Sequence, residues 1–206
     1  MADRSARRND PERRQRIIAA ALEVIAEHGV PATTHRRIAA AAGVPLGSVT
    51  YYFTSLEALL TDAFTQLAEE SSHAFATRMA QARSRGDARE AIIDIIAGSV
   101  WAEPRTLLLS YELYAFAARH PSVSTVMQGW MNNSRAALER FFDPLTARAL
   151  DALVEGIGIH NSIDPAPWTE MRSATSCIGS PATRRERKPV AIIVRRIIPP
   201  DPETHR

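Results

Sequence analysis

The sequence has little of what a disulfide-stabilised, zinc-binding or membrane-spanning protein needs. A single cysteine, Cys177, among 206 residues excludes an intramolecular disulfide and a cysteine-based zinc cluster, and it fits a reducing compartment. No apolar run approaches the roughly 20 residues of a membrane span, and none near the start of the chain suits a signal peptide. We therefore expect a cytoplasmic protein without a metal site, a cofactor or a membrane partner.

Glycine and aromatic residues are also sparse, with nine glycines and 6% aromatic residues. Long stretches are instead rich in Ala, Leu, Ile, Arg and Glu, which lose little side-chain freedom in a helix. Because 45% of the residues are hydrophobic, the chain can bury a sizeable core in a small head and a larger body. These features predict an all-α fold.

The net charge of +2 is unevenly distributed along the chain. Residues 1–53 hold 8 Arg against 5 acidic residues, residues 54–180 hold 10 Arg against 15, and residues 181–206 hold 7 basic against 3 acidic residues. The basic first segment favours a polyanionic partner, whereas the acidic middle suits another role. Arginine is also abundant throughout, so composition alone leaves a plain solvated surface equally open.

The first segment carries the pattern of three helices separated by glycine turns. Residues that suit helix starts are Asp10, Pro11, Thr33, Thr34 and Pro45, and those that suit helix ends are Gly29 and Gly43. The apolar spacing predicts a first helix over residues 11–28. A short second helix, a tight turn and a third helix follow, which is the order of a helix-turn-helix.

The rest of the chain predicts a helical body. Ser55 can cap a long helix towards Arg83, and Asp87 with Glu90 fits a capping box for the next helix. Later helices are expected over 105–119, about 123–141 and 143–160. We expect domains at 11–71, 72–180 and 181–206, the last an Arg- and Pro-rich disordered tail.

Residues 13–60 combine turn, cap and apolar positions in one order, namely Ile17, Ile18, Ala20, Ala21, Gly29, Thr33, Thr34, Ile38, Ala39, Ala42, Gly43, Val44, Gly47, Val49, Tyr52, Phe53, Glu57 and Leu59. With these positions in register, the stretch resembles the DNA-binding head of the tetracycline-repressor (TetR) family of bacterial regulators. The resemblance implies a three-helix head joined by a long helix to a bundle for ligand binding and dimerisation. It also implies a dimeric repressor that a small-molecule effector releases from operator DNA.

A recognition helix must present a slim, hydrogen-bonding side to a major groove about 12 Å wide. The residues that we expect at the DNA are Thr33, Thr34, Arg36, Arg37, Pro45, Leu46, Gly47, Ser48, Thr50, Tyr51 and Tyr52. The arginines beside the second helix's N-terminus suit phosphate. The alternative is that the threonines only cap, Tyr52 packs under the helix and the arginines are solvated.

Two positions depart from the family pattern. Relatives usually carry Tyr at the position of Thr50 and Lys at that of Leu56, and both residues typically contact the DNA backbone. We hypothesise that an N-terminal arm compensates by reaching the minor groove or phosphate through Arg4, Arg7 and Arg8.

The body is expected to hold the effector and the dimer contact. Candidate pocket residues combine apolar walls with polar tips, and they are Trp101, Tyr111, Tyr114, Phe116, Met127 and Trp130. The alternative for each is an ordinary core residue. The helix over 143–160 is the expected homodimer element, and a second interface helix should follow Trp168. Because the chain after about residue 170 lacks an amphipathic period, we hypothesise a shifted reading frame near residues 170–172.

Two other classes of protein compete with a regulator. An enzyme finds little support, because the sequence has no nucleophile elbow, no phosphate-binding glycine loop and no metal-ligand spacing among its histidines. A helical adaptor that binds another protein through its tail, without DNA, remains the main alternative. Salt-dependent, sequence-selective DNA binding would discriminate against both.

Overall fold

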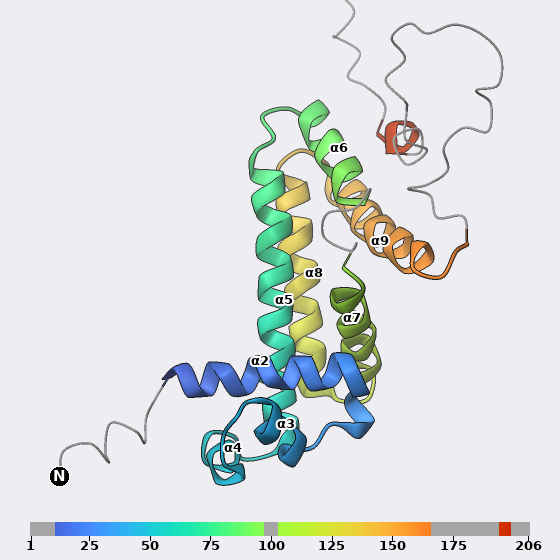
Figure 1. Cartoon of the computed structure of the whole chain (residues 1–206). Helices are drawn as coiled ribbons and strands as arrows, with labels where there is room; N and C mark the ends of the chain where they lie inside the picture. The colour runs from blue at the N-terminus through green and yellow to red at the C-terminus, as the bar shows by residue number, and fades with distance from the viewer. Residues whose placement is uncertain (1–10, 97–102, 166–193, 199–206) are drawn as a thin grey trace, which may run out of the picture. The chain divides into compact units, whose positions relative to one another are not determined.

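A computed structural model of the chain describes residues 11–96, 103–165 and 194–198, and these residues form helices without any strand (Figure 1). In chain order the elements are α2 (Pro11–His28), the 3-10 turn η1 (Val30–Ala32), α3 (His35–Ala41), α4 (Leu46–Tyr52), α5 (Leu56–Ala80), α6 (Arg85–Asp94), α7 (Pro104–Ala117), α8 (Pro121–Glu139) and α9 (Pro144–Asn161). The predicted all-α fold is confirmed. No helix in the described part is long and apolar enough to cross a membrane.

The helices pack into two compact units that are not consecutive in sequence. Unit 1 contains the chain up to Glu70 together with Leu108–Gly129, and unit 2 contains Ser71–Leu107 together with the chain from Trp130 onward. Helices α5 and α8 therefore contribute residues to both units. The domain boundaries expected from the sequence placed residues 108–129 in the body, at 72–180. In the structure these residues belong to unit 1, together with the head.

Unit 1 is built on one apolar core beneath α2, α3 and α4. Helix α2 crosses the beginning of α5, and α3 and α4 lie on the same side of it (Figure 1). The fully buried side chains of this core include Ile17, Ala21, Ile25, Ile38, Val49, Leu59 and Phe64. Gly29 ends α2 with φ 74° and Gly43 ends α3 with φ 63°, conformations that favour glycine. Both predicted helix ends are thereby confirmed.

Side chains at the helix starts explain where the helices begin. Thr34 caps α3, since its hydroxyl oxygen accepts the N–H of Arg37 at 3.2 Å. At α6 the capping box is formed by Ser84 and Asp87, each accepting the other's backbone N–H at 3.1 Å. The prediction that Asp87 and Glu90 form this box was wrong, because the N-cap lies three residues earlier. The N–H of Arg83 also donates to Asp87 and lowers the pKa of its carboxyl group.

The core of unit 2 draws on α5, α6, α8 and α9 and on residues 194–198. Val194 and Ile198 are buried in this core, and the Arg195 guanidinium lies 3.0 Å from the carboxylate of Glu90. These five residues differ from the disordered tail expected from the sequence, because two apolar side chains one helical turn apart reach the core. The remaining tail lies outside the described residues.

Candidate nucleic-acid interface

Helices α3 and α4 are joined by a tight glycine turn. The N–H of Val44 donates to the carbonyl of Ala39 at 3.0 Å, and Gly43 supplies the left-handed conformation that the reversal requires. The first turn of α4 is closed by the N–H of Ser48, which donates to the carbonyl of Pro45 at 2.8 Å. This is the predicted helix-turn-helix, formed by local hydrogen bonds.

Helix α4 turns one side to the core and the other to solvent. Val49 is fully buried and Phe53, just after the helix, is 3% exposed, so both side chains hold α4 against the core of unit 1. The opposite side carries the predicted contact residues, of which Tyr51 is 60% and Leu46 45% exposed, Pro45, Gly47 and Thr50 are exposed, and Ser48 and Tyr52 are half-buried. This side is therefore available to a partner.

Gly47 lies in an open place on this surface. No protein atom lies within 4 Å of the position that a Cβ atom would take there. Packing within the protein therefore does not explain a glycine in this helix, where alanine would stabilise it by roughly 0.5–1 kcal/mol. Close approach of another molecule would explain it.

The exposed start of α3 is positively charged. Arg36 and Arg37 are exposed, and neither forms an ion pair with any residue that the structure describes. Thr34 is exposed beside them. The sequence between Glu27 and Glu57 contains no acidic residue, so nothing in this stretch offsets the two guanidinium groups. Such a surface attracts phosphate.

Several of the predicted contact residues have partners inside the protein. Thr33 is 3% exposed and its hydroxyl donates to the carbonyl of Gly29 at 2.8 Å, so it fixes the turn before α3 rather than facing solvent. The hydroxyl of Thr50 donates to the carbonyl of Gly47 at 3.3 Å. The ring of Tyr52 meets the ring of Tyr51 edge to face, with centroids 5.2 Å apart.

The side chains that hold α2 against α5 were not predicted from the sequence. The Arg14 guanidinium lies 2.5 Å from the carboxylate of Asp62, and the same guanidinium lies 5.2 Å from the centroid of the Phe53 ring. These contacts fix the end of α4 relative to its supporting helices. The partners are 48 positions apart in the chain, and no local pattern indicates such a pair.

The predicted effector residues divide between the two units. Trp101 lies outside the described residues. In unit 1, Phe116 and Met127 are buried, and Tyr111 and Tyr114 are half-buried.

Trp130 lines a small cavity in unit 2, of about 20 Å³, together with Ser71, Phe75, Ser134, Asp151, Val154 and Glu155. A space of this size holds about one water molecule. Asp151 is 6% exposed, and the Nε atom of Arg135 lies 2.9 Å from its carboxylate. Burial raises the pKa of Asp151, while the neighbouring guanidinium acts in the opposite direction. The cavity therefore joins aromatic, hydroxyl and acidic side chains.

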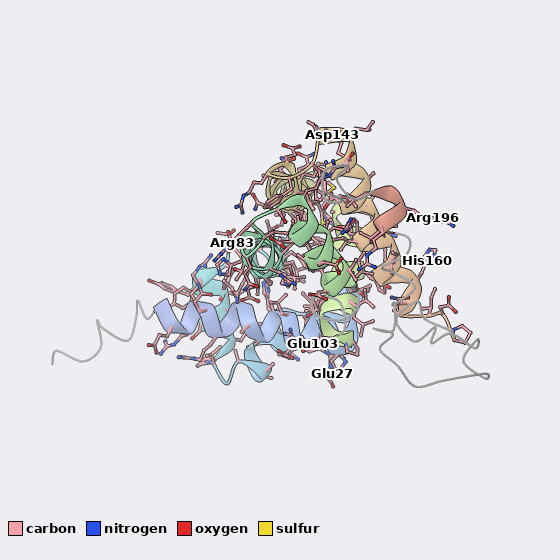
Figure 2. All side chains as sticks on the ribbon, turned by 90° about the horizontal axis from the view of Figure 1, so that it is seen from above. Glu27, Arg83, Glu103, Asp143, His160 and Arg196 are labelled. Atoms are coloured by element: carbon pink, nitrogen blue, oxygen red, sulfur yellow. The ribbon has the colours of Figure 1, made fainter. Side chains whose placement is uncertain are left out.

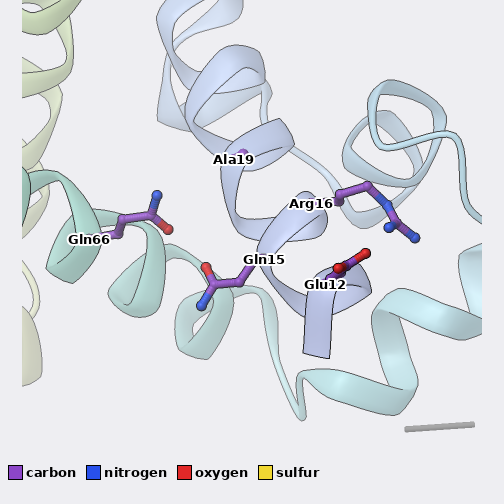
Figure 3. Close-up of a pocket in the computed structure, with 5 residues that line it drawn as sticks. All are labelled: Glu12, Gln15, Arg16, Ala19 and Gln66. Atoms are coloured by element: carbon purple, nitrogen blue, oxygen red, sulfur yellow. The ribbon is translucent and has the colours of Figure 1, made fainter. Parts of the chain in front are cut away.

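An open groove on unit 1 lies between α2 and α5 and has a volume of about 460 Å³. The side chains of Gln15 and Gln66 extend toward one another across it, and Ala19 also lines it (Figure 3). Among the residues that the structure describes, no group of His, Cys, Asp or Glu side chains could hold a metal ion.

A three-helix head whose second and third helices meet at a tight glycine turn, with an exposed arginine-rich start to the second, defines a DNA-binding protein of the helix-turn-helix class. Two family profiles match the chain. Residues 17–63 match the bacterial regulatory proteins of the tetR family, and residues 83–200 match the tetracyclin repressor-like C-terminal domain. The chain belongs to the TetR family and is a DNA-binding transcriptional regulator. The second match extends to residue 200, beyond residues 170–172, at which the hypothesis of a shifted reading frame places the change.

Several relatives resemble the chain over most of their length. The transcriptional regulator SCO7518 from Streptomyces coelicolor A3(2) is 40% identical, with 91% of this chain and 98% of that one covered and a TM-score of 0.75. The multidrug binding protein EbrR, in a complex with ethidium, is 33% identical, with 92% and 100% covered and a TM-score of 0.72. The regulator BetI 1 of Chromohalobacter salexigens is 28% identical over 166 residues, which are 75% of this chain and 81% of the relative.

Proposed function

We propose that this protein is a dimeric repressor that binds a pseudo-palindromic operator through α4 and leaves it when a small molecule occupies unit 2. The exposed surface of α3 and α4 carries the proposal, because it combines Arg36 and Arg37 with a slim helix face and has no acidic residue. The TetR family, to which the chain belongs, supports the same role.

In this proposal α4 enters the major groove. Leu46 contacts a thymine methyl group, and Ser48 donates a hydrogen bond to a base or phosphate. The hydroxyl of Tyr51 binds a phosphate oxygen, as do the arginines at the start of α3. Gly47 lets the backbone approach the DNA. Thr33 is left out, because its hydroxyl is buried and engaged with the chain.

The first experiment selects binding sites from a random duplex library and measures affinity for the recovered duplex at several salt concentrations. Replacing Arg36 or Arg37 by alanine should weaken binding to all sequences and lower the salt slope by about one each. The matched control is Arg119→Ala, because this exposed arginine lies just beyond α7 and donates to the carbonyl of Ala115. Equal slopes for all variants, or recovery of no preferred sequence, would contradict the proposal.

The outer face of α9 supports the dimer. One row of small and apolar residues on this helix is exposed or half-buried and recurs at alternating steps of four and three, namely Leu145, Ala149, Ala152, Gly156 and Ile159, with Ile163 continuing the row beyond the helix. Leu145 is 78% and Ile163 79% exposed. Figure 2 labels Asp143 and His160 near the two ends of this helix. Small residues in the middle of the row allow close approach of a second helix.

We therefore assign this row to a two-fold contact with a second copy of the chain, which would present two heads to successive major grooves about 34 Å apart. Ala152→Arg should convert the dimer to a monomer in analytical ultracentrifugation and weaken operator binding. Ala118→Arg is the control, since this alanine is exposed on unit 1. The second interface helix predicted after Trp168 lies outside the described residues. Unchanged association of the Ala152 variant would remove α9 from the interface.

The cavity around Trp130 is the proposed effector site, and its lining favours an aromatic cation. Trp130 and Phe75 line it with aromatic rings, and Asp151 and Glu155 line it with carboxyl groups, of which that of Asp151 pairs with Arg135. EbrR is known in complexes with ethidium and malachite green, both aromatic cations. Since the cavity has room for only about one water molecule, the effector must displace the side chains around it, and it then stabilises a different arrangement of the helices.

Calorimetric titration with malachite green tests this assignment. Asp151→Asn should weaken binding about tenfold, because the amide removes the charge and keeps the shape. The control is Asp94→Asn, since Asp94 is an exposed carboxylate of unit 2 that pairs with Arg78. Equal loss in both variants would point to a general electrostatic effect rather than to this cavity.

A further inference from the structure

Helix α7 contacts the turn that leads from α2 into the DNA-binding helices. The Oε2 atom of Glu112 accepts the backbone N–H of Val30 at 3.1 Å, although the two residues are 82 positions apart. Its other carboxylate oxygen lies close to Gly29, where a Cβ atom would come within 2.9 Å of it. Glu112 thus occupies the space that a side chain at position 29 would need.

This turn is tied directly to the proposed DNA contacts. The carbonyl of Gly29 accepts the hydroxyl of Thr33, and the next residue, Thr34, caps α3 through the N–H of Arg37. Two hydrogen bonds and five residues of chain therefore separate the Val30 N–H from the exposed arginines. A displacement of the Val30 N–H can therefore shift the start of α3 through these few bonds.

A second contact joins the same face of α7 to the beginning of α5. Phe116, one turn after Glu112, packs on Phe64 with ring centroids 5.7 Å apart and stacks on His120 at 4.0 Å. Beyond the end of α7, the carboxylate of Glu57 accepts the hydroxyl of Ser122 in α8 at 3.0 Å and lies 3.6 Å from the ring nitrogen of His120. Helix α7 therefore contacts the head at two points.

We infer that Glu112 is a positioning residue through which α7 sets the orientation of α3 and α4 for operator binding. The inference rests on the proposed function and adds a defined route between α7 and the DNA-binding surface. The hydrogen bond is charge-assisted and specific in direction, since only an acceptor at this place holds the Val30 N–H. A movement of α7 would change this bond, and linkage requires that operator binding in turn affect α7.

The test needs no effector, because linkage works in both directions. Hydrogen–deuterium exchange of the full chain is measured with and without the duplex recovered by site selection. In the unchanged protein, operator DNA should slow exchange in α7 as well as in α3 and α4. Glu112→Leu removes the acceptor and should abolish the slowing in α7, while Glu112→Gln keeps an acceptor oxygen and should retain it. Glu103→Leu is the control, since this exposed carboxylate precedes α7 and bonds Thr106.

Affinity supplies the second readout. Glu112→Leu should bind the selected duplex about tenfold more weakly and bind scrambled DNA as before, with Glu112→Gln close to the unchanged protein. The amide N–H of Val30 should exchange faster in the leucine variant even without DNA. Equal slowing of α7 in the leucine and unchanged proteins would overturn the inference while leaving the repressor proposal intact. Absence of selective binding by the unchanged protein would instead refute the proposed function itself.

Discussion

Replacing Gly29 by alanine tests the packing of α7 against the turn after α2. Gly29 has φ 74° and ψ 164°, a conformation essentially confined to glycine, and forcing another residue into it costs about 1–3 kcal/mol. The new Cβ atom would also lie 2.9 Å from the Glu112 carboxylate. That carboxylate must then move and lose the Val30 N–H, which adds about 1 kcal/mol. We expect Gly29→Ala to lower the free energy of unfolding by about 3 kcal/mol in total.

Gly43 provides a control in which a substitution adds backbone strain without a collision. It also has a positive φ, of 63°, but no atom lies within 4 Å of its would-be Cβ. Gly43→Ala should therefore cost only about 1–2 kcal/mol. Thermal and urea unfolding of both variants measure the difference, at about 2–4 °C of melting temperature per kcal/mol for a chain of this size.

A double-mutant cycle separates the two contributions at Gly29. In a Glu112→Ala background the collision is absent, so the added cost of Gly29→Ala should fall to the backbone term alone. If Gly29→Ala is no more destabilising than Gly43→Ala, or if its cost is the same in both backgrounds, Glu112 does not restrain the turn and the reasoning fails.

Three other predictions concern single side chains. Arg135→Met should destabilise the fold by roughly 3 kcal/mol, because it leaves the buried Asp151 carboxylate without its partner. Burial raises the pKa of Asp151 in the folded protein above 3.8, so this carboxyl group becomes charged, and needs its partner, only at higher pH. The loss of stability should therefore grow as the pH rises through that raised pKa, and a loss independent of pH would contradict the assignment. The Asp143 carboxylate accepts the Thr146 hydroxyl and N–H, which lowers its pKa, so its stabilisation of α9 should be present above pH 3.8 and disappear as the pH falls through the lower folded value. Acid unfolding of Asp143→Asn should lack this component, and an unchanged acid profile would refute it. Leu109→Ala should cost about 3–5 kcal/mol in urea unfolding, because this side chain is fully buried, and a cost below 1 kcal/mol would show that the site collapses around the gap.

Features determined by neighbouring residues were predictable from the sequence. Gly29 and Gly43 end their helices as expected, and Thr34 caps α3, because each effect depends on residues within four positions. The family resemblance over the head depends on the same local order. The all-α fold and the helix-turn-helix follow from these signals together.

Where two local readings fit equally well, the sequence could not choose between them. Ser84 and Asp87 share the spacing of Asp87 and Glu90, and the folded backbone selects the first pair. Thr33 and Thr34 are adjacent and chemically alike, yet one is buried and the other caps α3 from an exposed position.

Contacts between distant residues were missed for a different reason. The pairing of Arg14 with Asp62 and that of Glu112 with Val30 depend on how helices pack, and charged residues are too common for such pairs to be recognised in one sequence. The cavity around Trp130 was located only through one of its aromatic residues, because its hydroxyl and acidic members come from three helices.

Unit 1 is built from two stretches of the chain that are separated in sequence, and this affects the order in which it folds during synthesis. Its first part is complete at Glu70, but Leu108–Gly129 emerges from the ribosome later, and the hydrogen bond from Val30 to Glu112 must wait for it. Until then a nascent head lacks the residues that cover Phe64, which is fully buried in the finished protein. A truncated product that ends after α5 would carry the recognition helix without the support of α7. The head would thus become able to bind DNA only late in synthesis. Incomplete chains would then compete poorly for operators that finished repressors occupy.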